Sequence, residues 1–382
     1  MPEENDSMDN RPTIKGDDPL SEDELDSLKT IQSFNEGMVI SDRYQVLLKL
    51  GEGGMGRVYL ARDVELDELR AVKVLPDQIA NDIRAISKLK DEAKIAMSLN
   101  HPNIVKLFNY EKHNDTHLLV MEYVNGIDLH TYLAVKGALH EEEVKRIVME
   151  VAMALRNTHE RNIIHKDIKP SNIMLESKNL NMRLIKGKGT DLTKEDVPDL
   201  TDADVKLADF GIARQVRDSM SRYSVSDASG TPVYMSTEQV KGKKVDHRSD
   251  LYSLGVTMYE LLSGDLPFKG EAVTYQIMNE EAEEITGISN HIGGIIKQLL
   301  DKDKSERIQS ADELIKKLEN EEDLRLESKG LIFQQINQKG FKEYKNEKDG
   351  SEMVLIPDGE FMMGANESDG DAINDEKPQH KV

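Results

Sequence analysis

The sequence contains no cysteine in its 382 residues. This absence excludes disulfide bonds, cysteine nucleophiles and zinc sites built on cysteine, and it is compatible with a reducing compartment. Long hydrophobic runs are missing as well. A membrane helix needs about 18–20 apolar residues, whereas the longest candidate, 251–262, is interrupted by polar side chains.

Basic residues are scarce relative to acidic ones: 50 Lys and Arg face 72 Asp and Glu, which gives a net charge of −22. Binding to nucleic acid or to an anionic membrane relies on clustered basic side chains, so both partners are disfavoured. The amino terminus lacks the basic and apolar parts of a signal peptide. With 38% hydrophobic and 32% charged residues, the composition is that of a soluble globular protein, which we expect to be cytoplasmic.

Composition divides the chain into four parts. Residues 1–41 are acidic and poor in aromatic side chains, which predicts a disordered tail. Ordered structure is expected over 42–318, where apolar periodicity is strong. The charged, weakly periodic stretch 319–349 predicts a linker. Alternating apolar residues around a Pro-x-Gly turn in 350–382 predict a β-hairpin.

The first motif is a glycine-rich loop. The strand-like run 44–50 leads into Gly51, Gly53 and Gly56, spaced as G-x-G-x-x-G and followed by Val58. Glycines let a backbone fold tightly over phosphates and present N–H groups to them. Alone, the pattern also fits a dinucleotide-binding turn or a plain hairpin. Strand-type residues on both sides favour a loop between two strands.

Two charged residues follow in apolar surroundings. Lys73 interrupts the strand 71–75, where a lone lysine is usually a surface residue whose stem lies along apolar neighbours. Glu92 lies in a helix predicted over 83–99 from its apolar spacing. By composition Glu92 could be solvated, as could its neighbour Asp91. Next, the apolar stretch 118–124 predicts a buried strand, with or without a ligand beside it.

The stretch from His165 to Asn172 gathers a carboxylate, an ammonium and an amide in eight positions: Asp167, Lys169 and Asn172. These groups suit the removal of a proton from a hydroxyl, the stabilisation of a transferring phosphoryl group and the binding of a metal ion. Residues 177–203 are predicted to be an inserted surface excursion.

Together these motifs and the triplet that begins at Asp209 resemble those of the protein kinase family, from the Gly-rich loop to H-R-D-x-x-x-x-N and D-F-G. The resemblance covers about 42–318, and it is similar to bacterial Ser/Thr kinases in the segment that ends at Glu238. In the family this glutamate pairs with the residue at Arg307. Two departures are Lys166, where the pattern has Arg, and Thr237, where Pro is usual.

The resemblance implies an α+β, bilobal protein-kinase fold with a strand-rich small lobe, 42–124, and a helical large lobe, 125–318. It also implies ATP and Mg²⁺, or Mn²⁺, as cofactors. The implied nucleotide-binding residues are Gly51, Glu52, Gly53, Gly54, Gly56, Val58, Ala71, Lys73, Met121, Glu122 and Val124. The implied catalytic residues are Lys73, Glu92, Asp167 and Lys169, and the implied metal ligands are Asn172 and Asp209.

The implied roles follow the family. Lys73, held by an ion pair with Glu92, places the phosphates, Asp167 accepts the proton of the attacking hydroxyl, and Lys169 stabilises the γ-phosphoryl group. The expected function is phosphoryl transfer to Ser and Thr hydroxyls of proteins, the chain itself included, in bacterial signalling. Self-association for autophosphorylation is a family-level expectation. The alternative is a pseudokinase scaffold, or a binding protein whose C-terminal domain carries the function.

Regulation is predicted from two features. The expected activation segment, 212–230, carries five serines as candidate phosphorylation sites: Ser219, Ser221, Ser224, Ser226 and Ser229. Lys166 offers a phosphate only a point charge, whereas Arg offers a planar fork. We therefore expect weaker control by phosphorylation of this segment than in kinases that carry Arg.

Residues 350–382 resemble the opening of the formylglycine-generating (sulfatase-modifying) family, through M-V-x-I-P-x-G-x-F-x-M-G and then D-E-x-P-x-H. The resemblance implies a truncated domain that cannot bury a core of its own. The acidic run 366–376 does not have the spacing of a calcium-binding loop and is interpreted as a solvated loop.

Overall fold

The structure is a computed structural model, and it describes residues 33–53, 56–75, 83–177, 179–180, 192–209, 232–319, 331–336, 342–346, 352–354, 362–363 and 380–381. The chain divides into two compact units, Met1–Ile315 and Lys316–Val382. In the described ranges, no helix is both long enough and apolar enough to cross a membrane.

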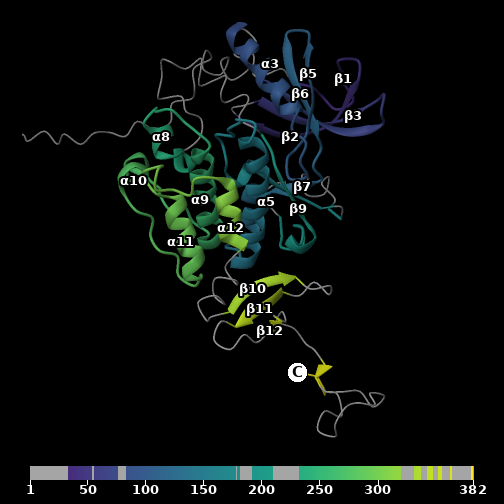
Figure 1. Cartoon of the computed structure of the whole chain (residues 1–382). Helices are drawn as coiled ribbons and strands as arrows, with labels where there is room; N and C mark the ends of the chain where they lie inside the picture. The colour runs from purple at the N-terminus through teal and green to yellow at the C-terminus, as the bar shows by residue number, and fades with distance from the viewer. Residues whose placement is uncertain are drawn as a thin grey trace, which may run out of the picture. The chain divides into compact units, whose positions relative to one another are not determined.

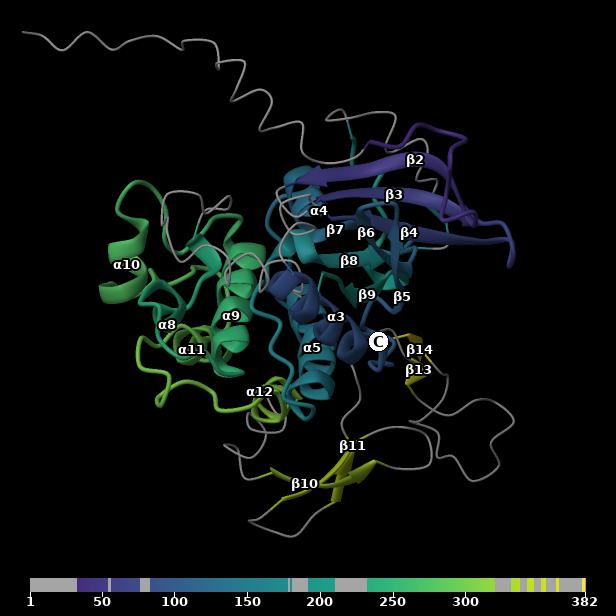
Figure 2. The same ribbon diagram turned by 90° about the horizontal axis from the view of Figure 1, so that it is seen from above.

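A six-stranded antiparallel sheet opens the first unit (Figure 1). Its strand order is β1-β2-β3-β4-β6-β5. Its strands are β1 (Val39–Ile40), β2 (Tyr44–Gly53), β3 (Gly56–Asp63), β4 (Glu68–Val74), β5 (Leu107–His113) and β6 (Thr116–Glu122). Seen from above, β2, β3 and β4 lie side by side (Figure 2). The strand-rich small lobe predicted from the sequence is confirmed.

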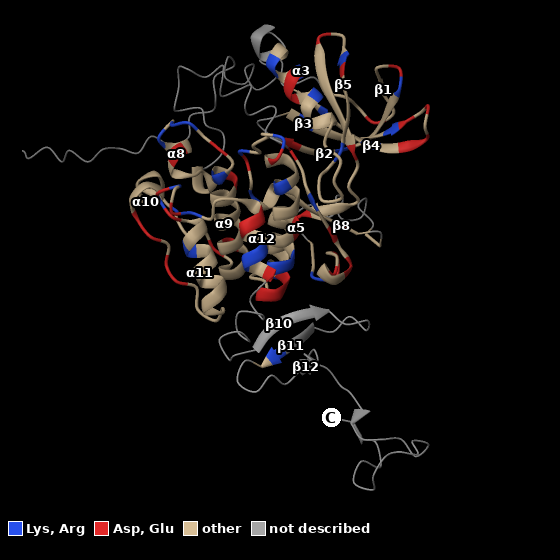
Figure 3. Ribbon diagram, viewed as in Figure 1, with Lys and Arg blue, Asp and Glu red and all other residues tan. Residues whose placement is uncertain are grey.

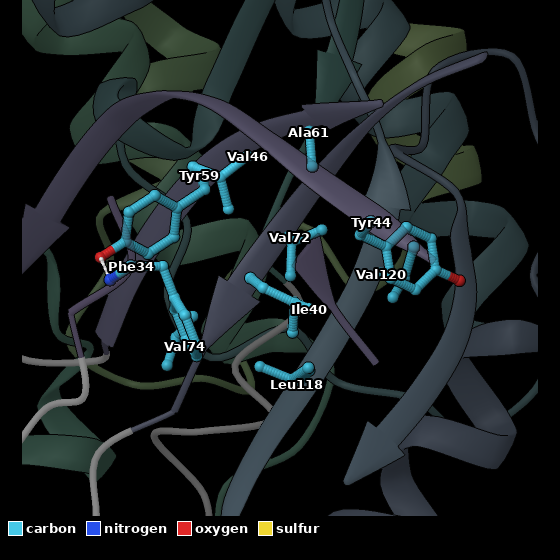
Figure 4. Close-up of a cluster of buried hydrophobic side chains, with 10 residues drawn as sticks. All are labelled: Phe34, Ile40, Tyr44, Val46, Tyr59, Ala61, Val72, Val74, Leu118 and Val120. Atoms are coloured by element: carbon cyan, nitrogen blue, oxygen red, sulfur yellow. Dashed lines mark hydrogen bonds between the residues drawn. The ribbon is translucent and has the colours of Figure 1, made fainter. Parts of the chain in front are cut away.

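The two faces of this sheet bury different partners. On one face, alternate residues of the strands pack against the segment before β2 (Figure 4), forming a cluster of Phe34, Ile40, Tyr44, Val46, Tyr59, Ala61, Val72, Val74, Leu118 and Val120. The other face packs against helix α3 (Ile83–Met97) through Leu75, Leu89, Ala93, Ala96, Leu107 and Leu119. Both faces are thus buried.

The folded lobe begins earlier than the boundary predicted at residue 42. Phe34 is 5% exposed and Ile40 is fully buried. The Phe34 N–H donates to the Tyr59 hydroxyl at 3.2 Å, and the two rings meet edge to face. Residues 33–41 are therefore part of the sheet's packing, which corrects that part of the predicted tail. The rest of the predicted tail, 1–32, lies outside the described residues.

The helical lobe is built around α9 (Arg248–Ser263), whose residues 249–262 are all buried. Helices α5 (Glu141–His159) and α11 (Asn290–Leu299) pack against it. Gly255 permits the approach of α11, because a Cβ there would lie 2.6 Å from Leu299 Cβ. Other helices among the described residues of this lobe are α4 (Leu129–Lys136), α8 (Thr237–Val240), α10 (Val273–Asn279) and α12 (Ala311–Glu319).

A small antiparallel sheet joins the lobes. It contains β7 (Gly126–Asp128), β8 (Ile173–Glu176) and β9 (Asp204–Leu207), and the 3₁₀ turns η1 (Pro170–Asn172) and η2 (Leu200–Asp202) directly precede β8 and β9. A further 3₁₀ turn, η4 (Pro232–Tyr234), lies just before α8. The connection between α3 and β5 docks on β9: Val105 N–H donates to Leu207 O, and Leu207 N–H donates to Asn103 O, each at 2.9 Å.

The predicted surface excursion, 177–203, is more closely packed than expected. On its return toward β9, Val197, Leu200 and Ala203 are buried. Arg146 of α5 donates to the carbonyls of Leu200 and Ala203, the latter at 3.1 Å. The second half of the insertion is therefore fastened to α5, and describing it as a surface loop was wrong for this half.

The described residues of the second unit form two small sheets. Strands β10 (Leu331–Ile336), β11 (Lys342–Asn346) and β12 (Glu352–Val354) form one, and β13 (Met362–Met363) pairs with β14 (His380–Lys381) in the other. The predicted linker 319–349 therefore contains two strands. The predicted hairpin is also wrong in its pairing, because β12 and β13 each pair with other strands and not with one another.

Candidate active site

Asp250 anchors the predicted catalytic loop to the buried helix α9 through hydrogen bonds. Its carboxylate is fully buried and accepts the backbone N–H groups of His165 at 2.8 Å and Lys166 at 2.7 Å. The Nε2 atom of His159, at the end of α5, lies 2.8 Å from the same carboxylate. These bonds hold the loop by its backbone, including the left-handed conformation of Lys166 at φ 67°, which few residues other than glycine adopt readily.

The His165 side chain connects the loop to the end of β9. Its Nε2 lies 3.0 Å from Ala208 O, and its Nδ1 accepts the Asp167 N–H at 3.3 Å. Complete burial lowers the pKa of His165. A neutral ring can donate from one nitrogen and accept at the other, which is what these two contacts require.

The three side chains singled out in this loop lie together. Asn172 Nδ2 donates to Asp167 Oδ2 at 3.0 Å and to the Asp167 carbonyl at 2.6 Å. Lys169 Nζ lies 2.9 Å from the same Oδ2. Asp167 is 7% exposed and Lys169 30%. The carboxylate is therefore oriented by an amide and an ammonium at a largely buried position.

The register of the sheet places four of the predicted nucleotide-binding residues on one face. Directly opposed residues of antiparallel strands point to the same side, and Val58 opposes Lys73 while Ala71 opposes Met121. Ala71 and Lys73 are two positions apart on β4, so both pairs share a face. Met121 packs against the apolar cluster to which α3 contributes Leu89, Ala93 and Ala96. This face of the sheet is therefore the one that faces α3.

The glycine-rich loop joins β2 and β3, as predicted from its flanking residues. Gly53 opposes Gly56 at the end of the hairpin. Gly56 has φ 121°, and a Cβ there would lie 2.0 Å from Val74 O, so packing against β4 requires glycine. Gly51 has open space around its missing Cβ, and both Gly51 and Glu52 are exposed. The backbone of the loop before its tip is thus accessible to a ligand.

Lys73 pairs with Asp209 in this structure. Its Nζ lies 2.6 Å from Asp209 Oδ1, and Asp209 itself has φ 55°. The implied ion pair between Lys73 and Glu92 is not formed, which corrects the expected contact. Instead, Glu92 Oε2 is buried without a hydrogen-bond partner. The lysine and the metal-ligand candidate are therefore together, whereas the helix glutamate stands apart from them.

The isolation of Glu92 affects its ionisation. Burial raises the pKa of Glu92 to about 7, although the charges of Lys88 and Lys166 act in the opposite direction. Lys166 belongs to the predicted catalytic loop, so this loop already acts on Glu92 electrostatically. An ion pair with a lysine would lower the pKa of Glu92 again, and the carboxyl group would then be ionised at neutral pH.

The strand after Met121 is fastened from three sides. The Glu122 carboxylate accepts the Lys106 N–H at 3.0 Å, and it lies 2.5 Å from Lys206 Nζ. Lys206 also lies 3.4 Å from Glu176 Oε2. The Glu122 N–H donates to Lys106 O at 2.8 Å. An adenine at this strand would therefore have to use the Glu122 carbonyl and not its N–H.

The departure at Thr237 has a structural explanation. Arg307 binds Glu238 through two parallel bonds of 2.9 Å, and both residues are buried. Burial would raise the pKa of Glu238, but Arg307 and the Ser249 hydroxyl outweigh it and lower this pKa to about 2. The Thr237 hydroxyl joins the pair, 3.0 Å from Arg307 Nη2 and 3.0 Å from Lys302 O. A proline could make neither contact.

The donor atoms at the loop suit a hard cation. Mg²⁺ is usually held by one or two protein oxygens together with water and substrate phosphates. Because Asn172 uses its Nδ2 on Asp167, its amide oxygen is the end that can face a cation, and the Asp209 carboxylate is partly exposed. Within the described ranges, no cluster of three or more His, Cys, Asp or Glu side chains is arranged for a metal. The site therefore fits a metal shared with phosphates.

Some predicted residues lie outside the described residues. These are Gly54 and the five serines of 212–230. In turn, the structure identifies contributors that the motifs did not reveal, above all Lys206 and Lys302. Each is one lysine among many in the sequence, and only its contacts distinguish it.

Comparison with known proteins agrees with this geometry. Residues 44–318 match the family described as protein kinase domain. The Ser/Thr kinase PrkC of Bacillus subtilis is 30% identical over 352 residues, covering 90% of this chain and 49% of that protein. PknB of Mycobacterium leprae is 35% identical over 286 residues, covering 72% and 42%. Pkn3 of Myxococcus xanthus is 39% identical over 240 residues, covering 62% and 40%.

Solved structures share the fold. A double mutant of the Mycobacterium tuberculosis PknI kinase domain superposes with a TM-score of 0.57 at 24% identity, covering 76% of this chain and 99% of that one. The chain therefore belongs to the protein kinase family, whose members use ATP and a divalent metal ion. Its domain is of the bacterial, eukaryotic-like Ser/Thr type represented by PrkC and PknB. The chain spans about half or less of the length of these curated relatives.

Proposed function

We propose that this chain is a Ser/Thr protein kinase that transfers the γ-phosphoryl group of ATP to protein hydroxyls, its own included, in bacterial signalling. The observation that carries the proposal is the group formed by Asp167, Lys169 and Asn172, fastened through Asp250 to α9. Holding a carboxylate and an ammonium together in a largely buried loop costs desolvation. A loop that served only packing would have no need of them.

In this proposal each residue has a separate task. Asp167 accepts the proton of the attacking hydroxyl, and Lys169 stabilises charge on the transferring group. Asn172 and Asp209 hold Mg²⁺ or Mn²⁺, which neutralises charge on the phosphates. The nucleotide is bound by the glycine-rich loop and the strand face described above, with Gly51, Glu52, Gly53, Gly54, Gly56, Val58, Ala71, Lys73, Met121, Glu122 and Val124.

The contact between Lys73 and Asp209 represents a resting arrangement. For phosphoryl transfer, Lys73 has to leave Asp209, face the phosphates and take Glu92 as its partner, since both the lysine–glutamate pair and the metal-bound aspartate are needed. The raised pKa of Glu92 supports this exchange, because an ammonium beside it would remove the cause of the shift.

Four further parts belong to the proposal. The kinase domain extends over about 33–318 and is joined through 319–349, which contains β10 and β11, to residues 350–382, which resemble the start of a formylglycine-generating domain. Self-association brings one copy's hydroxyls to another copy's site. The chain works in the cytoplasm, because its phosphoryl donor is ATP. These statements are supported by the sequence motifs and by the chemistry of the proposed reaction.

The test is transfer of radiolabelled phosphate from Mg²⁺-ATP by the full chain, to itself and to myelin basic protein. Asp167→Asn should lower transfer about 10²–10⁴-fold, the usual contribution of a general base. Asp115→Asn, at an exposed turn, is the matched control and should retain activity. Absence of transfer by the wild-type chain, with the fold intact, would favour the pseudokinase scaffold. Survival of activity in Asp167→Asn would show that the base is misassigned.

A further inference from the structure

Lys302 lies after α11, in the turn that leads to Arg307, and all contacts of its ammonium are with a different part of the lobe. Its Nζ donates to the carbonyls of Gln276 at 3.3 Å and Ile277 at 2.9 Å. It also lies 4.0 Å from the centre of the Phe268 ring. A cation is favourable at a helix C-terminus and over an aromatic face. Lys302 therefore fastens the last turn of α10.

The backbone of the same residue is bonded to the end of the activation segment. Lys302 O accepts the Thr237 hydroxyl at 3.0 Å, and Thr237 stands beside the buried pair of Glu238 and Arg307. One residue thus connects two elements, through its carbonyl to Thr237 and through its ammonium to α10. We call the pair Thr237 and Lys302 the tether.

The element that the tether holds forms a wall beside residues 232–234. Val233 is buried in one cluster with Phe268, Val273 and Ile277, the latter two from α10. Tyr234, partly buried in the same cluster, is fixed separately to α9, because its hydroxyl donates to Glu260 Oε2 at 2.6 Å. The position of α10 therefore determines the surroundings of residues 232–234, which lie shortly before Thr237 and Glu238 in the chain.

The outer surface of α10 is open to a large partner. Tyr275 is 59% exposed. Acidic side chains follow along the loop that leaves the helix (Figure 3), and Glu280, Glu281, Glu283 and Glu284 are all exposed. A protein substrate bound next to residues 232–234 would meet this surface, whereas ATP binds to the other lobe's sheet and would not.

We propose that Thr237 and Lys302 are positioning residues for the protein substrate: they hold α10 against residues 232–234 and so strengthen the binding of the substrate protein without taking part in the handling of ATP. The inference rests on the proposed kinase function and names a specificity device within it. Burial, together with the charge of Arg307, lowers the pKa of Lys302 to about 8. Its ammonium is therefore charged at neutral pH, as the contacts with carbonyl groups and a ring require.

The experiment measures KM for myelin basic protein, KM for ATP and kcat with the full chain. Lys302→Met removes the charge at similar length, and we expect KM for the protein substrate to rise about five- to tenfold, in proportion to the lost helix-end and ring contacts. KM for ATP and kcat should stay within about twofold, because a group that acts only on binding of one substrate leaves the others unchanged. Lys302→Arg should restore the wild-type value.

Lys316→Met is the matched control, because this exposed lysine lies on α12, away from the acidic loop after α10, and its replacement should change nothing. Thr237→Val removes only the hydroxyl and tests the other end of the tether if Lys302→Met does not fold. We expect a smaller rise in the same KM, and Thr237→Ser should reverse it. The inference would be overturned if KM for the protein substrate stayed unchanged in both variants. It would also be overturned if kcat fell and both KM values rose by similar factors. A wild-type chain that transfers no phosphate would refute the kinase function itself, and the inference with it.

Discussion

The two halves of the candidate site differ in how completely their polar groups are paired. In the catalytic loop, the side chains of Asp167, Lys169 and Asn172 bond to one another, and Asp250 holds the backbone. On α3, by contrast, Glu92 has a buried oxygen without a partner. The half in the helical lobe is held together by its own side chains, whereas the half on α3 lacks the pair with Lys73 that the proposed reaction requires.

Packing explains this difference. Helix α9, which holds the catalytic loop, is buried over 249–262. Helix α3 is fixed by a single apolar stripe that includes Leu89, Ala93 and Ala96. A helix buried all round cannot shift without disturbing a close-packed interior, while a helix attached along one stripe can move on the sheet. We infer that the change still required for activity is a movement of α3, because the loop, on which activity also depends, is already held in place by α9.

Removal of Asp250 should have the largest effect, because it dismantles the assembled half. Asp250→Ala leaves the backbone N–H groups of His165 and Lys166 without their acceptor, at a buried position. We expect a loss of about 3–5 kcal/mol in the free energy of unfolding, the usual cost of breaking a buried polar group of this kind, and loss of phosphoryl transfer.

Urea unfolding and phosphate transfer are the measurements for this variant. Asp246→Ala, at a partly exposed carboxylate that pairs with Arg248 and Lys304, is the control and should cost far less. If Asp250→Ala kept full activity, the loop would not depend on α9 and the contrast between the halves would be mistaken.

A substitution at Glu92 should separate activity from stability. Glu92→Gln removes the partner proposed for Lys73, so transfer should fall by about 10²–10³-fold, as for other groups that act on transition-state charge. Stability, by contrast, should increase. Glu92 has its pKa raised to about 7 in the folded chain. Its carboxylate therefore opposes folding above that pH, and the penalty fades as the pH falls toward the ordinary value.

Melting temperature at two pH values tests the sign. Glu92→Gln should melt about 1–3 °C higher than the wild type at pH 8. The difference should be much smaller at pH 4.5, where the folded wild-type chain carries the protonated group and the unfolded chain carries it about half of the time. We keep the shift small because Glu92 is partly exposed and solvent screens its charge. Asp91→Asn, an exposed neighbour, is the control. A variant that is less stable at pH 8 would contradict the raised pKa.

The motifs predicted what depends on neighbours in sequence. The octet 165–172 occupies one loop, so its spacing was enough to predict the group that contains Asp167 and Asn172. The contact between Lys73 and Glu92 depends instead on how α3 rests on the sheet, and no local pattern contains that information. The same applies to Lys302, whose partners on α10 are about 25 positions away. Contacts of this kind follow from packing.

The early boundary of the fold was missed for a different reason. Average composition over 1–41 is acidic and polar, yet two residues, Phe34 and Ile40, decide where packing begins. The average composition of 1–41 does not reveal these two buried residues. The insertion was misjudged similarly, because buried Val197 and Leu200 stand among charged residues and its contact with Arg146 lies far away in sequence.

The smallest effect is expected at Lys166, the residue that links the two halves, since its backbone hangs from Asp250 while its charge acts on Glu92. Replacing Ser219, Ser221, Ser224, Ser226 and Ser229 together with Ala should lower activity by no more than about fivefold, the worth of one exposed ion pair. The same replacement in a Lys166→Arg background should cost more, because a guanidinium binds a phosphate with two parallel bonds and an ammonium does not. Activity and phosphate content are measured side by side on four chains: Lys166 and Lys166→Arg, each with and without the five serines. If the chain that keeps Lys166 and lacks the serines falls to background activity, a point charge suffices for control, and α3 is not the element that limits activity.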